Sequence, residues 1–551
     1  MIPSSQISPL PVQRAMAATI SMVTLHPRFN QFHFQRQSFN LNTPTSLLPT
    51  LYSSPPKFKL YCTNNSSVTT AAAVVTEEAY EKHVEGERFD WYSEWYAVAP
   101  VCDLDKRVPH GKKILGIDVV IWWDRNQEQW RVFDDSCPHR LAPLSEGRID
   151  AWGRLQCVYH GWCFNGSGSC KLIPQAPLDG NPVHTSKKAC VASYPCTVQH
   201  DILWFWPNSD PQYQDIVTKK QPPYIPELDD PSYTRSMGIR DFPYGYEVLV
   251  ENIMDPAHVH YAHYGLMPPM PTDRSRPNAD REGGRPLDFS VQKVDKTGFS
   301  GKQQGGYNQF MPPCVFYMAP NKSDTTCGSE SESASISEKV SEEELKRRLL
   351  IFICIPVSPG KCRALWIFPR NFVVWLDKIV PRWMFHIVHN LVLDSDLYLL
   401  HMEEQKIMEI GSGNWQKAFY VPTKSDAIVV AFRKWLNKYA GGGVDWREKF
   451  DAKVLPTTPR RDVLMDRYWS HVVNCSSCSA AYNGLKLTET MLQIVSVALI
   501  GVVALIRHGS LTALQRTSLF ATALFCFAIS KWLSNFIYKH FHFHDYKHAL
   551  I

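Results

Sequence analysis

Short apolar runs bounded by turn residues fill the middle of the chain, and longer apolar runs fill its end. Ile114–Trp123 and Trp130–Phe133 are rich in β-branched and aromatic residues, and a polar segment separates them. Leu349–Val357 and Cys362–Pro369 repeat this pattern around the turn sequence Ser358-Pro359-Gly360. Runs of this kind predict strands. The sequence therefore indicates a β-module in the first half and an antiparallel sheet in the second.

Three further apolar runs have the length of helices. Trp383–Leu393 reads as a hydrophobic helical run, and acidic residues follow it. Thr490–Ile506 and Thr517–Ser530 are uncharged and strongly apolar, each slightly shorter than the ~20 residues that cross a bilayer. Their flanks can extend both runs over 485–538, which predicts a helical membrane hairpin. The alternative is a packed amphipathic pair, but such helices seldom lack a polar face so completely.

The net positive charge of the chain comes from its first 76 residues. The first 76 residues contain no acidic residue and five Lys or Arg, with many Ser, Thr, Pro and Ala. This composition is typical of a chloroplast transit peptide, and a disordered tail is the alternative. The remainder holds 53 basic and 53 acidic residues, since five of the 58 basic residues lie in that segment. It therefore has no net basic character that would favour nucleic acid as a partner.

Two short segments each combine one cysteine with one histidine. Seventeen residues separate Cys137-Pro138-His139 from Cys157-Val158-Tyr159-His160. In a Rieske [2Fe–2S] cluster two cysteines bind one iron and two histidines bind the other. Zinc is the alternative, but zinc modules usually pair like ligands within one segment. The pattern predicts that Cys137, His139, Cys157 and His160 hold a cluster that accepts and passes on single electrons.

A histidine pair about a hundred residues later suggests a second metal. His258 and His263, completed by a distant carboxylate, would form the 2-His-1-carboxylate triad of a non-heme Fe(II). On a helix Asn252, Asp255 and His258 share one stripe, whereas His263 lies about 140° from His258. We therefore predict a π-bulge or a break between Pro256 and His263. His260 is the competing ligand, but it is shifted off that stripe.

The third ligand must come from the acids after the hydrophobic helical run. Asp396 is our prediction, because an ionised carboxylate on a buried helix is costly unless it binds a metal or a cation. Asp394 is the rival, and a solvated N-capping acid is the alternative.

Cys475 and Cys478 form a C-x-x-C within 471–480, between the predicted iron site and the predicted membrane helices. Two thiols at this spacing can close a disulfide or be reduced by thioredoxin, which would make a redox switch. Inert thiols are the alternative. No second pair of this kind follows, so a zinc ribbon is not predicted.

The motif stretches resemble those of plant chloroplast Rieske oxygenases. The matching residues are 137–147, 156–162, 244–247 and 251–265, and similarity extends over nearly everything from Phe89 to Tyr482. The resemblance is to the group that includes pheophorbide a oxygenase, chlorophyllide a oxygenase and the protochlorophyllide-dependent translocon component. A flavone 8-hydroxylase belongs to the same branch, so the substrate does not follow from the match.

This resemblance implies an α+β fold in three parts. An all-β Rieske module is expected over 89–215, and a helix-grip-like mononuclear iron domain of antiparallel sheet plus helices over 216–465. The membrane hairpin follows. Pro268–Pro286 and Ser323–Glu344 are expected to interrupt the second domain as loops, the first being either a lid or a plain surface loop.

The resemblance also implies a trimer and a route for electrons. In relatives the subunits form head-to-tail trimers, and the residue matching Asp255 bridges a cluster histidine of one subunit to an iron-ligand histidine of its neighbour. Asp255 would then connect His160 and His258, and Asn252 would lie beside the iron. No flavin or nicotinamide fingerprint is found, so electrons are expected from ferredoxin and its reductase.

The expected function is monooxygenation of a large planar substrate by O₂, in a chloroplast membrane of either the envelope or the thylakoid. The substrate is either a chlorophyll-pathway tetrapyrrole resembling protochlorophyllide or a flavonoid hydroxylated at position 8. The alternative is a redox-sensing component of a chloroplast import translocon that performs no oxygenation. A pure sensor has no need of His258, His263 and Asp396 together, which favours the enzyme.

Overall fold

The computed structural model describes residues 88–548, apart from 267–283, 321–345, 451–454 and five single positions, 178, 285, 304, 448 and 508. The predicted transit segment and nearly all of both predicted loops lie outside the described residues. The chain divides into Met1–Glu78 and Ala79–Ile551, and all that follows concerns the second unit.

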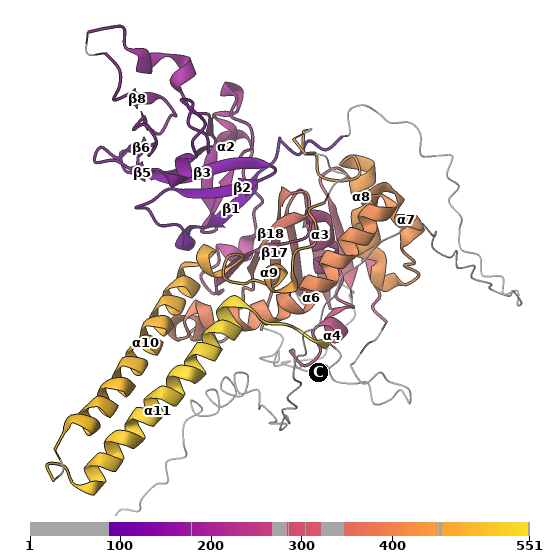
Figure 1. Cartoon of the computed structure of the whole chain (residues 1–551). Helices are drawn as coiled ribbons and strands as arrows, with labels where there is room; N and C mark the ends of the chain where they lie inside the picture. The colour runs from indigo at the N-terminus through magenta and orange to yellow at the C-terminus, as the bar shows by residue number, and fades with distance from the viewer. Residues whose placement is uncertain are drawn as a thin grey trace, which may run out of the picture. The chain divides into compact units, whose positions relative to one another are not determined.

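Three small antiparallel sheets build the first part of the described chain (Figure 1). The sheet β1-β11-β10 consists of β1 (Tyr96–Pro100), β11 (Ile202–Phe205) and β10 (Cys196–Gln199). The sheet β2-β3-β4-β9 consists of β2 (His110–Ile114), β3 (Ile117–Asp124), β4 (Gln129–Asp134) and β9 (Ser193–Tyr194). The sheet β5-β6-β7-β8 consists of β5 (Arg148–Ile149), β6 (Leu155–Gln156), β7 (Cys163–Phe164) and β8 (Cys170–Leu172).

The predicted strand Ile114–Trp123 is wrong at its beginning. Ile114 is the last residue of β2, and it pairs with Ile117 across a two-residue turn. Leu115 and Gly116 in this turn have φ values of 51° and 70°. Two consecutive positive φ values match the twist of a tight hairpin. The apolar run therefore spans a turn, which hydrophobicity alone does not reveal.

A seven-stranded antiparallel sheet forms the second part, as predicted. Its order is β12-β18-β17-β16-β15-β14-β13. The strands are β12 (Met237–Phe242), β13 (Ser290–Val291), β14 (Phe299–Gln303), β15 (Gly306–Met311), β16 (Val315–Pro320), β17 (Leu350–Ser358) and β18 (Lys361–Ile367). The hairpin predicted around Pro359-Gly360 joins β17 to β18. Gly360 has a φ of 69°, which the third position of a type II turn requires.

Helices accompany this sheet. They are α2 (Ile216–Lys219), α3 (Tyr246–Met254), α4 (Val259–Ala262), α5 (Leu376–Ile379), α6 (Arg382–Ile410), α7 (Trp415–Ala418), α8 (Ala427–Tyr439) and α9 (Arg461–Leu464). The long helix α6 begins after Pro381 and ends at Gly411, whose φ is 91°. Four of its buried polar residues recur at helical spacing: His386, Asn390, Asp394 and His401. The first of them faces the sheet, since His386 Nε2 lies 3.0 Å from the Met237 carbonyl of β12.

One hydrophobic core runs through both parts of the described chain. The Phe89 amide donates to the Tyr439 carbonyl at 2.8 Å, and the Phe89 ring lies 5.1 Å from that of Trp435. The turn between β2 and β3 also bonds to the second sheet, since the Leu115 amide donates to the Pro356 carbonyl at 2.7 Å. The β-module and the large sheet are therefore joined by backbone hydrogen bonds as well as by side chains.

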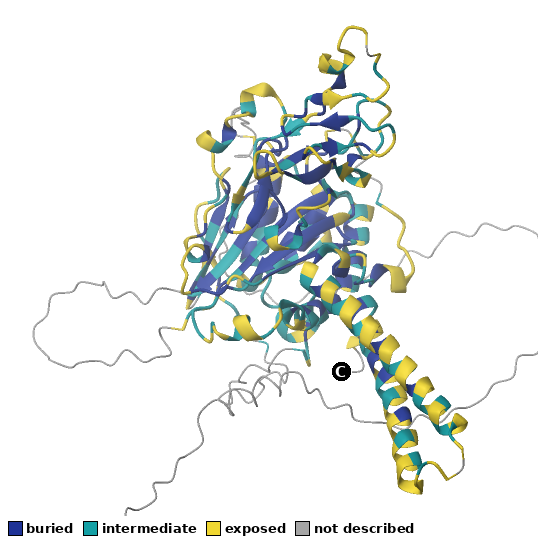
Figure 2. Cartoon of the chain, turned by 90° about the vertical axis from the view of Figure 1, so that its left-hand side faces the viewer, coloured by how far each residue is buried: buried dark blue, intermediate teal, exposed yellow. Residues whose placement is uncertain are grey.

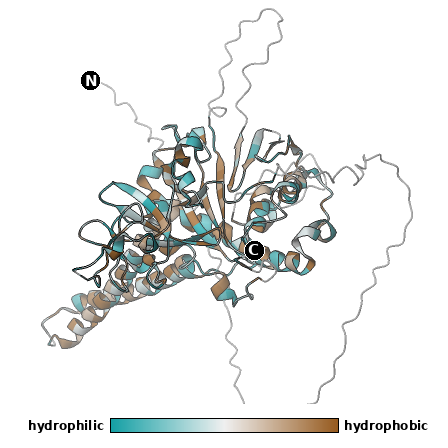
Figure 3. Cartoon of the chain, turned by 90° about the horizontal axis from the view of Figure 1, so that it is seen from above, coloured by the Kyte–Doolittle hydropathy of each residue, from teal (hydrophilic) through white to brown (hydrophobic). Residues whose placement is uncertain are grey.

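Two long apolar helices close the described chain. They are α10 (Ser476–Leu505) and α11 (Ala513–Ile537), and each is long and apolar enough to cross a membrane. They lie side by side, and the Ser496 hydroxyl donates to the Ala523 carbonyl at 2.8 Å. Most of their side chains are exposed although they are hydrophobic (Figure 2, Figure 3). Two long apolar helices in contact are therefore present where the helical hairpin is predicted, and α10 begins earlier than predicted, directly after Cys475.

Candidate metal centres

The two predicted cluster loops have the same backbone turn. The Cys137 amide donates to the Ala142 carbonyl at 2.9 Å, and the Leu141 amide donates back to Cys137 at 2.8 Å. The Cys157 amide donates to the Trp162 carbonyl at 2.9 Å, and the Gly161 amide donates back to Cys157 at 3.0 Å. Each loop therefore presents its ligands from an equivalent frame.

The cysteines of these loops lie inside and the histidines lie towards the outside. Cys137 and Cys157 are 2% and 1% exposed, and the rings of His139 and His160 lie 4.4 Å apart. Trp162 stacks on His139 with ring centroids 4.8 Å apart. The Nδ1 atom of His139 is buried without a hydrogen-bond partner among the described residues. A buried polar atom without a partner is costly, and a metal ion would satisfy it. These residues therefore fit a Rieske cluster.

Replacing Gly161 by alanine is expected to lower the free energy of unfolding by about 1–2 kcal/mol. Gly161 has a φ of 77°, and a Cβ atom there would lie 3.0 Å from Pro174. Gly180→Ala is the matched control, since its nearest neighbour would be at an ordinary 3.7 Å. Denaturant unfolding of both variants, followed by loss of the cluster absorption, measures the difference. Equal midpoints for the two variants would contradict a strained loop.

The second predicted group is assembled from two distant segments. The Nε2 atoms of His258 and His263 lie 3.7 Å and 3.5 Å from Asp396 Oδ2. One ligand atom from each of the three residues lies within 4.8 Å of the others. His260 is not part of this group. The predicted break is confirmed at the beginning of its range, because α3 ends at Met254 and a separate short helix begins at Val259. The two histidines flank this short helix.

Polar neighbours orient the two rings. The Nδ1 atom of His263 lies 2.7 Å from Ser395 Oγ, so its Nε2 atom faces Asp396. The Nδ1 atom of His258 lies 3.6 Å from Asp255 Oδ2, and its Nε2 atom lies 3.4 Å from Asn252 Nδ2. Hydrogen bonding at one ring nitrogen fixes which nitrogen can bind a metal. For His263 this leaves Nε2 to face the carboxylate. His258 Nδ1 has no hydrogen-bond partner among the described residues, but the Nε2 atom of this ring also faces Asp396.

Burial sets the protonation of this group. It lowers the pKa of His263 to about 3, with a smaller contribution from His258, so this ring is neutral and able to bind a metal. Burial raises the pKa of Asp396 to about 6, and His258 opposes the rise. For His258 burial lowers the pKa, but the nearby Asp255 and Asp396 outweigh it and leave the pKa raised. Two imidazoles and a carboxylate fit a mononuclear Fe(II).

Asp394, the rival ligand, is engaged elsewhere. Its carboxylate lies 2.7 Å from Arg240 Nη2 and 2.6 Å from Arg467 Nε, and all three side chains are fully buried. Residues that are two positions apart on a helix point about 200° away from each other, so Asp394 and Asp396 project in different directions from α6. Asp394 is therefore part of a buried ion triad, and the alternative of a solvated capping acid is wrong for it.

Several residues of these sites have no role that the sequence predicted. Ser395, which orients His263, and Trp162, which stacks on His139, carry no motif of their own. Buried Glu251 pairs with Arg433 of α8, which anchors α3 beside Asn252. The cysteines Cys475 and Cys478 lie next to His386 and His471, and neither histidine was predicted. The spacing of His471 from Cys475, one helical turn, was the available signal.

Comparison with known proteins agrees with these sites. Residues 94–195 match the Rieske [2Fe-2S] domain family, and residues 310–414 match the pheophorbide a oxygenase family. The chain is 54% identical to protochlorophyllide-dependent translocon component 52 of Arabidopsis thaliana, over 98% of this chain and 100% of that protein. It is 49% identical to flavonoid 8-hydroxylase 2 of Ocimum basilicum, over 96% of this chain and 95% of that protein.

A third relative extends the match to another named oxygenase. The chain is 34% identical to pheophorbide a oxygenase of Oryza sativa subsp. japonica, over 84% of this chain and 86% of that protein. All three relatives are described as chloroplastic. The chain therefore belongs to the family of plant chloroplast Rieske oxygenases that includes pheophorbide a oxygenase and protochlorophyllide-dependent translocon component 52.

Proposed function

We propose that the protein is a ferredoxin-dependent monooxygenase that hydroxylates a large planar substrate with O₂. The observation that carries the proposal is the meeting of His258, His263 and Asp396 in a chain that also holds a Rieske domain. Cys137, His139, Cys157 and His160 would hold the cluster, and the first three residues would hold Fe(II). In each turnover two electrons and two protons are consumed, one oxygen atom enters the substrate, and the other leaves as water.

The residues around the iron position would each have a separate role. His258, His263 and Asp396 would hold Fe(II), which would supply the binding and activation of O₂. Ser395 holds the His263 ring, and burial keeps that ring neutral. Asn252 lies beside His258 and can orient it. Asp396 supplies the negative charge that a buried divalent cation requires.

Asp255 is proposed to link the two metal centres across a subunit boundary of a trimer. Its carboxylate lies near His258 and is 31% exposed, so one face remains available to a neighbouring subunit. On the cluster loops Leu141 is 76% exposed, Tyr159 60% and Val158 47%. Exposed apolar residues beside His139 and His160 support a contact surface for another subunit or for ferredoxin.

Replacing Asp255 by asparagine is expected to leave both metal centres loaded and to lower turnover by about 10- to 100-fold, the usual effect of losing a group that supports a metal ligand. The reason is that the amide cannot accept hydrogen bonds from two histidines as the carboxylate does. Iron content, the EPR signal of the cluster and turnover should be measured together. Asp215→Asn, an exposed carboxylate paired with Lys219, is the control. Normal turnover with full iron would refute the role of Asp255.

The substrate is proposed to be either a chlorophyll-pathway tetrapyrrole or a flavonoid. The first follows from similarity to protochlorophyllide-dependent translocon component 52, and the second from similarity to flavonoid 8-hydroxylase 2. Purified full-length protein should be incubated with ferredoxin, its reductase and isotopically labelled O₂. Protochlorophyllide and a panel of flavones serve as candidate substrates. One labelled oxygen atom in a product supports the proposal, and uncoupled consumption of O₂ with every candidate counts against these two classes.

A redox-sensing role in a protein-import translocon is the second candidate function. The name of the relative that is 54% identical supports it. Against it stands the complete group of two histidines and a carboxylate, which sensing does not require. If Asp396→Asn abolished oxygenation but left redox-dependent import unchanged, the sensing role would be independent of the iron.

The location is proposed to be a chloroplast membrane, of either the envelope or the thylakoid. The acid-free first 76 residues support import, and the exposed apolar helices α10 and α11 support anchoring. At 30 residues α10 is about 45 Å long, which exceeds the ~30 Å hydrocarbon core of a bilayer. A membrane anchor suits a planar substrate of low solubility. Regulation by thioredoxin through a Cys475–Cys478 disulfide is the alternative to the metal site that is proposed below for the same cysteines.

A further inference from the structure

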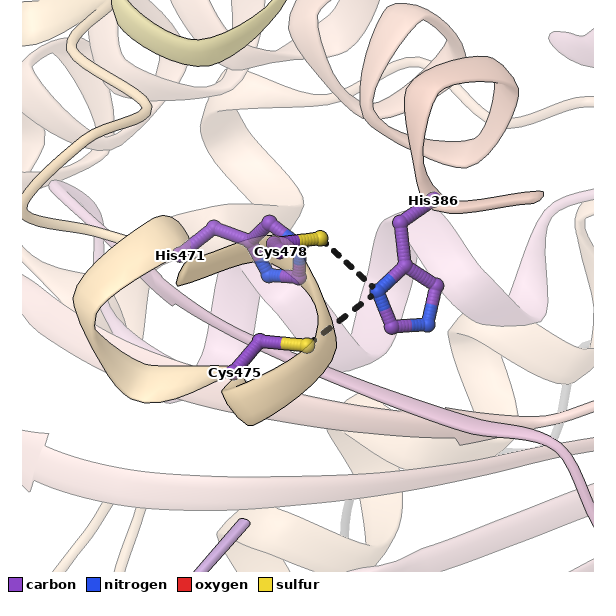
Figure 4. Close-up of side chains that lie close together, drawn as sticks. All are labelled: His386, His471, Cys475 and Cys478. Carbon is purple, nitrogen blue, oxygen red and sulfur yellow. Dashed lines mark hydrogen bonds between the residues drawn. The ribbon is translucent and has the colours of Figure 1, made fainter. Parts of the chain in front are cut away.

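We propose that His386, His471, Cys475 and Cys478 form a third metal site, which holds one structural Zn²⁺. The four residues come from three segments: α6, the loop before α10, and the first turn of α10. All four are buried, and one ligand atom from each lies within 4.8 Å of the others. Both sulfurs point towards the ring of His386 (Figure 4). The proposal does not rest on the oxygenase function.

The distances fit tetrahedral zinc. The Nδ1 atom of His386 lies 3.5 Å from Cys475 Sγ and 3.4 Å from Cys478 Sγ, and His471 Nε2 lies 3.2 Å from Cys478 Sγ. Zinc bonds of about 2.3 Å to sulfur and 2.0–2.1 Å to nitrogen, at tetrahedral angles, place sulfur and nitrogen about 3.5 Å apart. The four donors therefore surround a point that a single zinc ion can occupy with little movement.

The far nitrogens of both histidines are already engaged. His386 Nε2 lies 3.0 Å from the Met237 carbonyl, and His471 Nδ1 lies 2.6 Å from the Ile239 carbonyl. A carbonyl only accepts, so each of these nitrogens carries the hydrogen, and the opposite nitrogen presents its lone pair to the sulfurs. Backbone carbonyls commonly orient metal-binding histidines in this way. Here both carbonyls belong to β12, at alternate residues and therefore along one edge of the strand.

Hydrogen bonds explain only part of this arrangement. If Cys475 donates to His386 and Cys478 donates to His471, the 3.4 Å contact of Cys478 Sγ with His386 Nδ1 is left unexplained. Two thiols converge on His386 Nδ1, which has one lone pair and can accept well from only one of them. Cys478 has one hydrogen and faces two acceptors, His386 and His471. A divalent cation explains all three contacts at once. Two thiolates and two neutral imidazoles around it give a site without net charge. Such a site can be buried at little electrostatic cost.

The site differs from a Rieske cluster with the same ligand types. A binuclear cluster places its cysteines and histidines on opposite irons. Here each cysteine sulfur is within 3.5 Å of a histidine nitrogen, which a single ion requires. The cysteines are also poorly placed for exchange with an external reductant, since Cys475 is 0% and Cys478 is 3% exposed. Zinc would connect β12, the helix that carries Asp396, and the beginning of α10.

Metal analysis of the full-length protein purified in detergent tests the proposal. We expect about one zinc per chain in addition to iron. Zinc-edge X-ray absorption should show two sulfur ligands at about 2.3 Å and two nitrogen ligands at about 2.0 Å. Both measurements use the wild-type protein and so do not depend on the folding of a variant. Absence of zinc, iron in its place, or an oxidised Cys475–Cys478 disulfide without metal would overturn the proposal.

Variants then locate the zinc. Cys475→Ser and His386→Asn are expected to lose at least about 90% of the zinc, while iron and the Rieske EPR signal remain. His389→Asn is the matched control, because His389 is a histidine of the same helix that accepts from Trp366 and lies outside the group. Cys137→Ser should lose the cluster iron and keep the zinc. Zinc retained in Cys475→Ser and His386→Asn, or lost in Cys137→Ser, would overturn the assignment.

Discussion

Replacing Asp396 by asparagine is expected to reduce iron from about three to about two atoms per chain and to lower turnover by more than about 100-fold. The neutral amide leaves His258 and His263 without the anionic ligand that balances a buried divalent cation. The cluster residues lie on other segments, so the Rieske EPR signal should be unchanged. Iron analysis and turnover with the identified substrate measure both effects.

Glu409→Gln is the matched control for this change. It is an exposed acid of the same helix, paired with Lys406, and it is expected to keep full iron content and activity. An Asp396→Asn protein that retained about three irons would show that another residue completes the iron site.

Replacing Asp394 by alanine is expected to lower the free energy of unfolding by about 3–5 kcal/mol. The side chains of Asp394, Arg240 and Arg467 are fully buried, so the change would leave two arginines without their shared partner. Arg240 lies on β12 and Arg467 follows α9, so the loss would loosen the attachment of α6 to the sheet. Denaturant unfolding in detergent measures the change.

A surface ion pair provides the control for Asp394. Asp462→Ala breaks an exposed pair with Arg460 and is expected to change the free energy by less than about 1 kcal/mol. Folded Asp394→Ala protein should retain its mononuclear iron, which separates this residue from Asp396. A loss of stability no greater than that of Asp462→Ala would contradict the buried triad.

The two aspartates show how far sequence can predict such a site. The apolar run before them predicts a buried helix, and the cost of a buried charge predicts a metal or a cation beside Asp396. The helix is present and both acids are buried in it, but Asp394 pairs with two arginines whereas Asp396 faces a histidine pair. Which acid faces which partner depends on the rotation of α6 against the sheet. That rotation is set by packing between residues far apart in sequence.

Local spacing was informative where ligands lie close together in sequence. The five-residue separation of His258 and His263 predicts a break in the helix, and the chain does leave the helix at 255–258, with the two histidines at the ends of α4. Hydrophobicity was less informative at Leu115, where a tight turn divides an apolar run. His386 lies 89 positions before Cys475 in the sequence, so no local pattern connects them. Only the folded chain brings that group together.

EPR spectroscopy of the reduced full-length protein, combined with iron and sulfide analysis of the same sample, tests the central claim most directly. The claim is that one polypeptide holds both a histidine-ligated cluster and a separate ferrous ion, and that the cluster supplies electrons to this ion. The predicted result is a Rieske-type signal with about three irons and about two sulfides per chain. When O₂ and substrate are added, the cluster should be oxidised, so that the EPR signal disappears while the iron and sulfide contents stay the same. A fully metal-loaded protein without a Rieske-type signal, or one with zinc at Cys137 and Cys157, would contradict the account.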